Sequence, residues 1–227
     1  MILTDQLLLI TAMKTMVDIL KVTGICPILL GAGPGQAAPA ARALVDGGLP
    51  VVEVLQRGEN ALEDLKTIVR EVPEIYAGAG TVLTARQAEE VIDAGAKFVV
   101  MPGFKKDVVE TCLKHNVMVV PGCCTPTEVM MIAEYDIIVA KFFPFYQMGG
   151  IPTLNELGGI YPDMKFIVTG ALNSENFLPT LESPKTLAAG GNWMFMDHDA
   201  LPNSDYEQIR INMRESVLKV QNMRNKK

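Results

Sequence analysis

Short apolar runs alternate with amphipathic stretches along nearly the whole chain, and this alternation constrains the fold more than any other feature. Eight runs have the length and the β-branched content of buried strands: Cys26–Leu30, Val51–Leu55, Ile75–Ala79, Phe98–Met101, Met118–Pro121, Ile137–Phe143, Phe166–Thr169 and Thr186–Ala189. The stretches between them have helical periodicity, as at Gln36–Asp46, Ala61–Glu71, Ala85–Ala94, Lys106–His115 and Thr127–Tyr135. Strands that alternate with helices predict a parallel sheet.

Eight strands within 227 residues predict a compact (β/α)8 TIM barrel of the α/β class, built as one domain over residues 1–227 with the barrel at about 25–222. The competing architecture is an open doubly wound sheet, which needs a nucleotide-binding loop after its first strand. Residues 31–35 read GAGPG and resemble such a loop only superficially, because the full glycine fingerprint is absent.

Helices are also expected at both ends of the chain. Residues of about 5–22 are apolar but interrupted by charges and lack a basic leader, so they predict an amphipathic helix and not a signal peptide. A final helix is expected from Asp205, ending in a basic tail, NMRNKK, that we expect to fray. Within the chain, Thr84 with Gln87 three residues later predicts a capping box at a helix start.

Charge and cysteine usage narrow the possible partners. The formal net charge is −6 and the isoelectric point is near 5.0, which disfavours nucleic acid and anionic membranes as partners. Four cysteines without CxxC spacing predict reduced thiols in the cytoplasm, with the adjacent Cys123 and Cys124 buried and inert. Two histidines leave little material for a metal site or a Ser-His-Asp triad.

In a barrel of this kind, chemistry is expected where strands end and βα loops begin. Period-two alternation places Glu53, Leu55 and Arg57 on one side of their strand, and the same parity aligns Lys141 with Phe143. A lysine held in apolar surroundings gives up its proton more readily and can form a Schiff base with a ketone. Inward-facing Glu53, Arg57 and Lys141 would converge in one pocket. The alternative is that Lys141 reaches solvent and that Glu53 and Arg57 form a surface pair.

Several short motifs, in their order along the chain, resemble the KDPG/KHG aldolases, the 2-keto-3-deoxy-6-phosphogluconate and 4-hydroxy-2-oxoglutarate aldolases. The motifs are EVLQR at Glu53–Arg57, GAGTVL at Gly78–Leu83, Ala94–Phe98, Pro102-Gly103, Pro121–Thr125, KFFP at Lys141–Pro144, Thr169-Gly170 and Gly190–Trp193. The match spans about residues 24–201, and GAGTVL followed by KFFP is its most specific part. The resemblance implies a (β/α)8 barrel, a class I mechanism without a metal cofactor, a homotrimer and a role in carbohydrate metabolism, in the Entner–Doudoroff pathway.

The resemblance also implies roles for individual residues. Lys141 corresponds to the Schiff-base lysine and Glu53 to the general acid/base. Arg57 and Thr81 correspond to the binders of the pyruvate carboxylate, and Phe143 would shield the imine from water. The remaining substrate-binding positions that it implies are Pro102 and, at the distal end, Gly170, Ala171, Gly191 and Asn192.

This chain departs from the family pattern at positions that bear on the substrate. Leu55 stands where members have an inward threonine, and Ala171 and Asn192 stand where they have a glycine and a serine of the phosphate site. Phe145 and Tyr146 replace a small residue and a glutamate, and we expect them to add bulk over the lysine.

The sequence therefore predicts a lyase that cleaves a 2-keto-3-deoxy-6-phosphogluconate or 4-hydroxy-2-oxoglutarate type substrate to pyruvate and an aldehyde. Three alternatives stay open. The first is an aldolase for a non-phosphorylated 2-keto-3-deoxy acid, and the second is a catalytically silent barrel that binds a keto acid. The third is a pyruvate-dependent decarboxylase that uses the same Schiff base.

Overall fold

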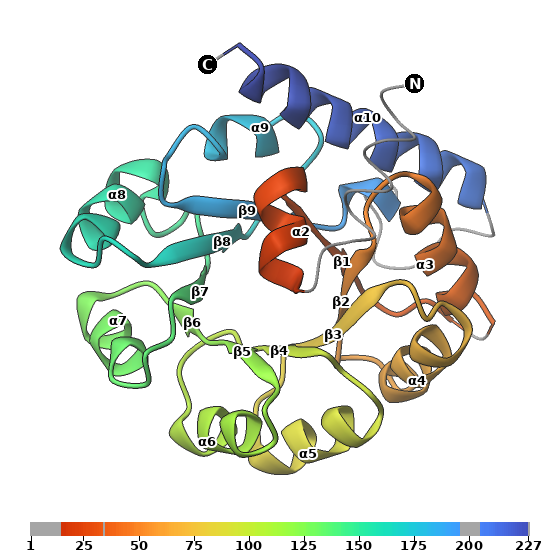
Figure 1. The fold of residues 1–227 in the computed structure, drawn as a ribbon, viewed down its shortest axis with the longest axis horizontal. Coiled ribbons are helices and arrows are strands. Elements are labelled where there is room, and N and C mark those ends of the chain that lie inside the picture. Colours follow the sequence, from red (N-terminus) through yellow and green to blue (C-terminus); the bar gives the residue numbers. More distant parts are fainter. Residues whose placement is uncertain (1–14, 34, 196–204, 227) are drawn as a thin grey trace.

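The computed structural model describes residues 15–33, 35–195 and 205–226, and in Figure 1 its strands form a central ring surrounded by helices. All strand pairs are parallel, and the order around the sheet is β5-β4-β3-β2-β1-β9-β8-β7-β6. The strands are β1 Ile25–Leu29, β2 Val51–Leu55, β3 Tyr76–Gly80, β4 Phe98–Val100, β5 Met118–Val120, β6 Gly122–Cys123, β7 Val139–Phe142, β8 Lys165–Thr169 and β9 Thr186–Gly191.

The two ends of this sheet order belong to one continuous segment, so the sheet closes into a barrel. β5 and β6 are separated only by Pro121, which has no N–H to donate. The Val120 carbonyl accepts from the Met101 N–H at 3.1 Å, and the Pro121 carbonyl accepts from the Lys141 N–H at 2.8 Å. The expected strand Met118–Pro121 is therefore present as two short pieces. The prediction of an eight-stranded barrel is confirmed.

The helices lie outside the ring, apart from α2, which lies across the end where the strands begin (Figure 1). Their bounds are α2 Met16–Thr23, α3 Ala37–Asp46, α4 Ala61–Glu71, α5 Ala85–Asp93, α6 Lys106–Lys114, α7 Pro126–Ala133, α8 Gly150–Ile160, α9 Phe177–Thr180 and α10 Tyr206–Arg224, with a short 3-10 turn at Trp193–Phe195. Among the described residues, no helix is long and apolar enough to cross a membrane.

Both terminal helices differ in detail from the prediction. The helix expected at about 5–22 is observed as α2 from residue 16 onward, and residues 5–14 lie outside the described part of the chain. The basic tail was expected to fray, but its first three residues, 222–224, belong to α10, which ends at Arg224. The Arg224 guanidinium donates to the Lys21 carbonyl at 2.6 Å, so this tail holds the carbonyl end of α2.

The start of α5 also differs from the predicted capping box. Thr84 is the N-cap as expected, and its hydroxyl accepts from the Gln87 N–H at 3.1 Å. The Gln87 side chain does not return to the N–H of Thr84. It accepts instead from the Leu83 N–H at 2.9 Å.

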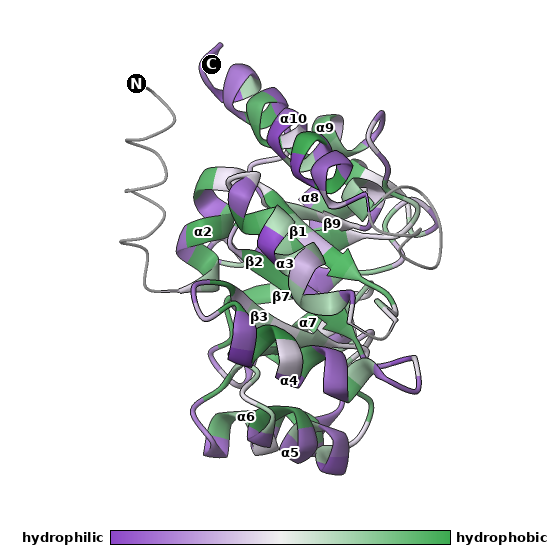
Figure 2. Ribbon diagram, turned by 90° about the vertical axis from the view of Figure 1, so that its right-hand side faces the viewer, coloured by the Kyte–Doolittle hydropathy of each residue, from purple (hydrophilic) through white to green (hydrophobic). Residues whose placement is uncertain are grey.

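The strands are buried on both faces, which is why their sequences are almost continuously apolar. In Figure 2 the strands are hydrophobic, while the surrounding helices α4, α5 and α6 also carry hydrophilic residues. Two charged residues are nevertheless buried inside the strands: Glu53 is 1% exposed and Lys141 is 6% exposed. A charge inside such a core is costly unless it is paired, so these two positions mark the site.

Candidate active site

Lys141 and Glu53 meet across the interior of the barrel. Lys141 lies on β7 and Glu53 on β2, on opposite sides of the ring, and the Lys141 Nζ lies 3.2 Å from Glu53 Oε1. The two side chains are 88 positions apart in sequence. This contact requires both to point inward, as period-two alternation predicted. A buried pair at this distance lets a proton pass directly from the ammonium to the carboxylate.

Glu53 has room to reach Lys141 because β3 has no side chain beside it. Glu53 is paired with Gly78 in the β2–β3 register, and Leu55 is paired with Gly80. A Cβ at Gly80 would lie 2.6 Å from the Cγ of Glu53 and from the Cδ2 of Leu55, and closer still to Glu53 Oε1. The Glu53 side chain therefore lies flat over the backbone of Gly80.

Arg57 and Thr81 form a second, more exposed pair at the same end of the barrel. Arg57 follows β2, and its Nε donates to the Thr81 Oγ1 at 3.0 Å. Thr81 follows β3 and has a φ of 57°. A β-branched residue in this region is strained by about 1–3 kcal/mol and persists only where its surroundings hold it. Such strain is typical of functional sites.

A cavity of about 220 Å³ opens above Lys141 at the ends of the strands. Among the predicted site residues, those on its wall are Arg57, Lys141, Phe143, Gly170, Ala171, Gly191 and Asn192. The Lys141 Nζ lies 5.8 Å from the centre of the Phe143 ring. The other residues on the wall are Ile28, Leu30, Leu55, Thr169, Leu172 and Gly190. Arg57 and Lys141 are the cations of this wall, and they come from opposite sides of the ring, after β2 and on β7.

Thr169 belongs to the Thr169-Gly170 motif but was given no role of its own, and the structure places it on the cavity wall. Its side chain is 3% exposed, and its hydroxyl has no hydrogen-bond partner among the described residues. A buried hydroxyl without a partner is costly unless a ligand completes it. Period-two alternation along β8, which places Thr169 on the same side as Ile167, was the signal that could have identified it.

Other predicted positions do not reach the cavity wall. Pro102 packs against Gly122, where a Cβ would lie 2.6 Å from the Gly103 N, and it is not among the residues that line the cavity. Glu53 and Thr81 are also absent from the lining, but each contacts a residue of the wall: Glu53 contacts Lys141, and Thr81 contacts Arg57.

The expectation that Phe145 and Tyr146 add bulk over the lysine is wrong. Phe145 is 1% exposed and packs in the core, with its ring centre 6.0 Å from that of Phe142. Tyr146 turns outward, and its hydroxyl donates to the Asn176 carbonyl at 3.2 Å. Phe145, which follows the end of β7, therefore packs into the hydrophobic core and does not line the cavity.

The cysteines remain protonated thiols at neutral pH, so they do not compete with Lys141 as nucleophiles. All four are free. Cys26, Cys112 and Cys123 are buried, whereas Cys124, which was expected to be buried, is only partly so. Burial raises the pKa of Cys112 to about 11 and, together with the Glu128 and Cys124 charges, that of Cys123 to about 12. Burial also raises the pKa of Cys26, where the Glu53 carboxylate adds to the effect and Lys141 opposes it. Within the described ranges no cluster of three or more His, Cys, Asp or Glu side chains is placed to hold a metal ion.

Comparison with known proteins gives a consistent assignment over most of the chain. The family model for KDPG and KHG aldolase matches residues 16–211. The KHG/KDPG aldolase of Escherichia coli is 35% identical over 205 residues, which cover 90% of this chain and 96% of the relative. The 2-dehydro-3-deoxy-phosphogluconate aldolase of Pseudoalteromonas atlantica is 36% identical over 192 residues, which cover 85% and 89%.

A solved structure supports the same likeness in three dimensions. The KDPG aldolase of Legionella pneumophila, crystallised with pyruvate captured at low pH as a covalent carbinolamine intermediate, superposes with a TM-score of 0.84. It is 30% identical in sequence, and the alignment covers 89% of this chain and 98% of that structure.

Proposed function

Since this chain belongs to the KDPG and KHG aldolase family, it is a lyase of the Schiff-base aldolase type, and we propose that Lys141 is its nucleophile and Glu53 its proton-transfer group. The observation that carries this proposal is the 3.2 Å contact between Lys141 Nζ and Glu53 Oε1 inside the barrel. A protein that only binds a keto acid has no use for this buried pair, which opposes the reading of a silent barrel.

The reaction begins with formation of a covalent bond between Lys141 and the substrate. Glu53 accepts a proton from the Lys141 ammonium, and the free amine attacks the C2 ketone to give a carbinolamine. Glu53 then gives this proton to the carbinolamine hydroxyl, which leaves as water; the product is an iminium, and Glu53 is again a carboxylate. Arg57 presents a planar fork to the C1 carboxylate, oriented by the Thr81 hydroxyl. Phe143 lies beside the nitrogen and excludes water from it.

Cleavage and release use the same carboxylate twice. Glu53 removes the proton of the C4 hydroxyl, the C3–C4 bond breaks, and its electron pair neutralises the iminium to give an enamine and a free aldehyde. Glu53 then returns a proton to the enamine carbon, and hydrolysis of the resulting imine releases pyruvate and Lys141. One carboxylate within reach of the lysine suits both proton transfers.

The substrate we propose is of the 2-keto-3-deoxy-6-phosphogluconate or 4-hydroxy-2-oxoglutarate type, with glyceraldehyde 3-phosphate or glyoxylate as the second product. The part of the cavity wall at the ends of β8 and β9 offers the Thr169 hydroxyl and the Asn192 amide to the aldehyde portion. We also propose Gly170, Ala171 and Gly191 as binding positions on this wall and retain Pro102 as a proposed contact of the substrate.

The remaining properties that we propose come from the family and the composition. They are a single barrel domain, a homotrimer, catalysis without a cofactor beyond the covalent Schiff base, a cytoplasmic location and a place in the Entner–Doudoroff pathway. Analytical ultracentrifugation tests the trimer, and activity that persists after exhaustive chelation tests the independence from metals.

Trapping with borohydride tests the central assignment. Pyruvate with borohydride should add one reduced pyruvate per chain, and peptide mass spectrometry should place it on Lys141. The Lys141→Ala variant should form no adduct. A matched control is Lys165→Ala, because Lys165 begins the neighbouring strand β8 and donates to the Pro184 carbonyl at 2.9 Å, away from the cavity. An adduct on Lys141→Ala protein would overturn the assignment. Decarboxylation of an oxo acid without release of an aldehyde would instead favour the decarboxylase alternative.

A further inference from the structure

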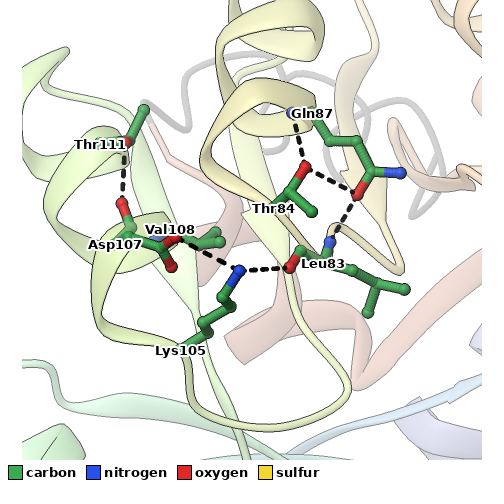
Figure 3. Close-up of polar contacts among 7 residues, drawn as sticks. All are labelled: Leu83, Thr84, Gln87, Lys105, Asp107, Val108 and Thr111. Atoms are coloured by element: carbon green, nitrogen blue, oxygen red, sulfur yellow. Dashed lines mark hydrogen bonds and ion pairs between the residues drawn. The ribbon is translucent and has the colours of Figure 1, made fainter.

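The backbone of Leu83, in the loop after β3, is held by two side chains from different helices (Figure 3). The Leu83 N–H donates to the Oε1 of Gln87, on α5, at 2.9 Å. The Leu83 carbonyl accepts from the Nζ of Lys105, at the start of α6, at 3.3 Å. Lys105 is itself held by Asp107, whose carboxylate lies 3.3 Å from the same Nζ. We call Gln87 and Lys105 together the Leu83 clamp.

The clamp fixes the backbone on the C-terminal side of the strained residue Thr81. On the first flank, the Gly80 carbonyl accepts from the Gln56 N–H at 2.8 Å. After Thr81, the Val82 N–H donates to the Val100 carbonyl at 3.2 Å, and Leu83 is then held by the clamp. The φ of 57° at Thr81 is strained, and such a conformation persists only where the surrounding structure holds it. Because its strain favours relaxation, Thr81 depends on these contacts.

Thr81 in turn determines where Arg57 points. Arg57 is exposed, and within the described residues the Thr81 hydroxyl is the hydrogen-bond acceptor of its guanidinium, with no carboxylate within ion-pair distance. A long exposed side chain with one fixed contact loses its orientation when that contact moves. The geometry of the fork therefore follows the conformation of Thr81.

We propose that Gln87 and Lys105 are positioning residues for carboxylate recognition: they hold Thr81 in its left-handed conformation so that Arg57 is aimed at the carboxylate of the keto acid. The proposal rests on the proposed function, because it takes Arg57 to be the carboxylate-binding residue. A purely structural role for Gln87, as part of the start of α5, predicts a loss of stability with unchanged affinity for the keto acid.

The test measures borohydride trapping as a function of pyruvate concentration. In Gln87→Met/Lys105→Met protein, the pyruvate concentration for half-maximal trapping should rise about five- to tenfold, since two hydrogen bonds are lost. The maximal trapping rate should stay within about twofold of the parent, because Lys141 and Glu53 are untouched. Lys106→Met is the matched control: the neighbouring lysine pairs with Glu110 at 3.6 Å and should behave as the parent.

Two further variants separate positioning from a structural effect. Lys105→Arg retains a donor for the Leu83 carbonyl and should keep the parent's half-saturation. In a Thr81→Val background, which keeps the β-branched shape but removes the hydroxyl, the clamp substitutions should cause no additional rise. An unchanged half-saturation in the double variant overturns the proposal, and so does a full additional effect in the Thr81→Val background. The proposed function fails separately, if the parent protein forms no adduct or if Lys141→Ala protein forms one.

Discussion

Replacement of Gly80 by alanine should disable catalysis while leaving the fold in place. Gly80 lies at the end of β3 and has an ordinary backbone conformation, because its φ is outside the left-handed region. Alanine is therefore allowed by the backbone, and the whole effect comes from the added methyl group. That methyl would lie 2.6 Å from the Cγ of Glu53, where the optimal separation of two carbon atoms is about 3.5–4.0 Å.

The size of the effect follows from these distances. The Glu53 side chain must move by about 1 Å to clear the methyl group, which breaks its 3.2 Å contact with Lys141. A displacement of about 1 Å costs on the order of 100-fold in rate, and general acid/base catalysis as a whole contributes about 100- to 10,000-fold. We expect kcat to fall about 100-fold. KM should change less than about threefold because Arg57 and Thr81 are not displaced, and overpacking should cost about 1–3 kcal/mol of stability.

The assay couples pyruvate release to NADH oxidation by lactate dehydrogenase, with thermal melts to check folding. Gly159→Ala is the matched control, because a Cβ at Gly159, on α8, meets nothing within 4 Å; its kcat should equal the parent's. Glu53→Gln should lose about as much activity as Gly80→Ala. A folded Gly80→Ala protein with kcat within threefold of the parent would refute the argument that the bare backbone of Gly80 admits Glu53.

Three further predictions concern recognition of the substrate carboxylate by Arg57, the buried thiols, and Asn192 on the cavity wall. Arg57→Leu should raise KM about 10- to 100-fold with a smaller change in kcat, and Arg57→Lys should not rescue it, since charge-assisted hydrogen bonds contribute about 1.5–3 kcal/mol; equal KM values for parent and variant would contradict this. The folded pKa values of Cys112 and Cys123, about 11 and 12, lie above the roughly 8.5 of an unfolded cysteine, so stability should be full below about pH 8.5 and fall as the pH rises toward the folded values. The urea midpoint should therefore drop between pH 8 and pH 10.5, less steeply in Cys112→Ala/Cys123→Ala protein, and identical slopes would refute the attribution. Asn192→Ala should lower kcat/KM about tenfold for the phosphorylated six-carbon substrate and leave 4-hydroxy-2-oxoglutarate nearly unchanged; an equal loss for both would exclude a phosphate contact.

The sequence predicted the barrel well because its signals are local and repeated. Each buried strand has to be apolar on both faces, so its run is visible without knowledge of its neighbours. Glu53 and Lys141 could be paired in advance because period-two alternation fixes which side of a strand a residue faces, and a barrel has one interior. The division of one strand into β5 and β6 also has a local cause, the missing N–H of Pro121. The hydrogen bonds that remain on either side of Pro121 come from the neighbouring strands and could not be read from this segment alone.

The positions that sequence reasoning misplaced lie in loops, where no periodicity fixes direction. Phe145 follows Lys141 by only four positions, yet it turns into the core, whereas Tyr146 turns outward to Asn176. Gln87 had the right spacing for a capping box, but its side chain found the N–H of Leu83 because the preceding turn is distorted at Thr81. The Tyr146 contact joins residues 30 positions apart, whereas the contacts of Phe145 and Gln87 are local but depend on the path of the backbone, which spacing alone does not give.

Glycines also determine the space available for catalysis. A sequence pattern does not predict this effect, because a glycine contributes no side chain to the pattern. The interior of a barrel of this size is normally filled by layers of side chains. Here Gly80 leaves room for Glu53, and Gly122 lies against the backbone of Pro102. Gly190 on β9 leaves room for Thr169, because a Cβ at Gly190 would overlap the Cγ2 of Thr169. Gly80 and Gly190 therefore make room for side chains inside the barrel, so that Glu53 and Lys141 can meet where a core would otherwise close. The catalytic pair and the missing side chains belong to one arrangement, and a substitution that refills the space should remove activity as surely as the loss of Lys141.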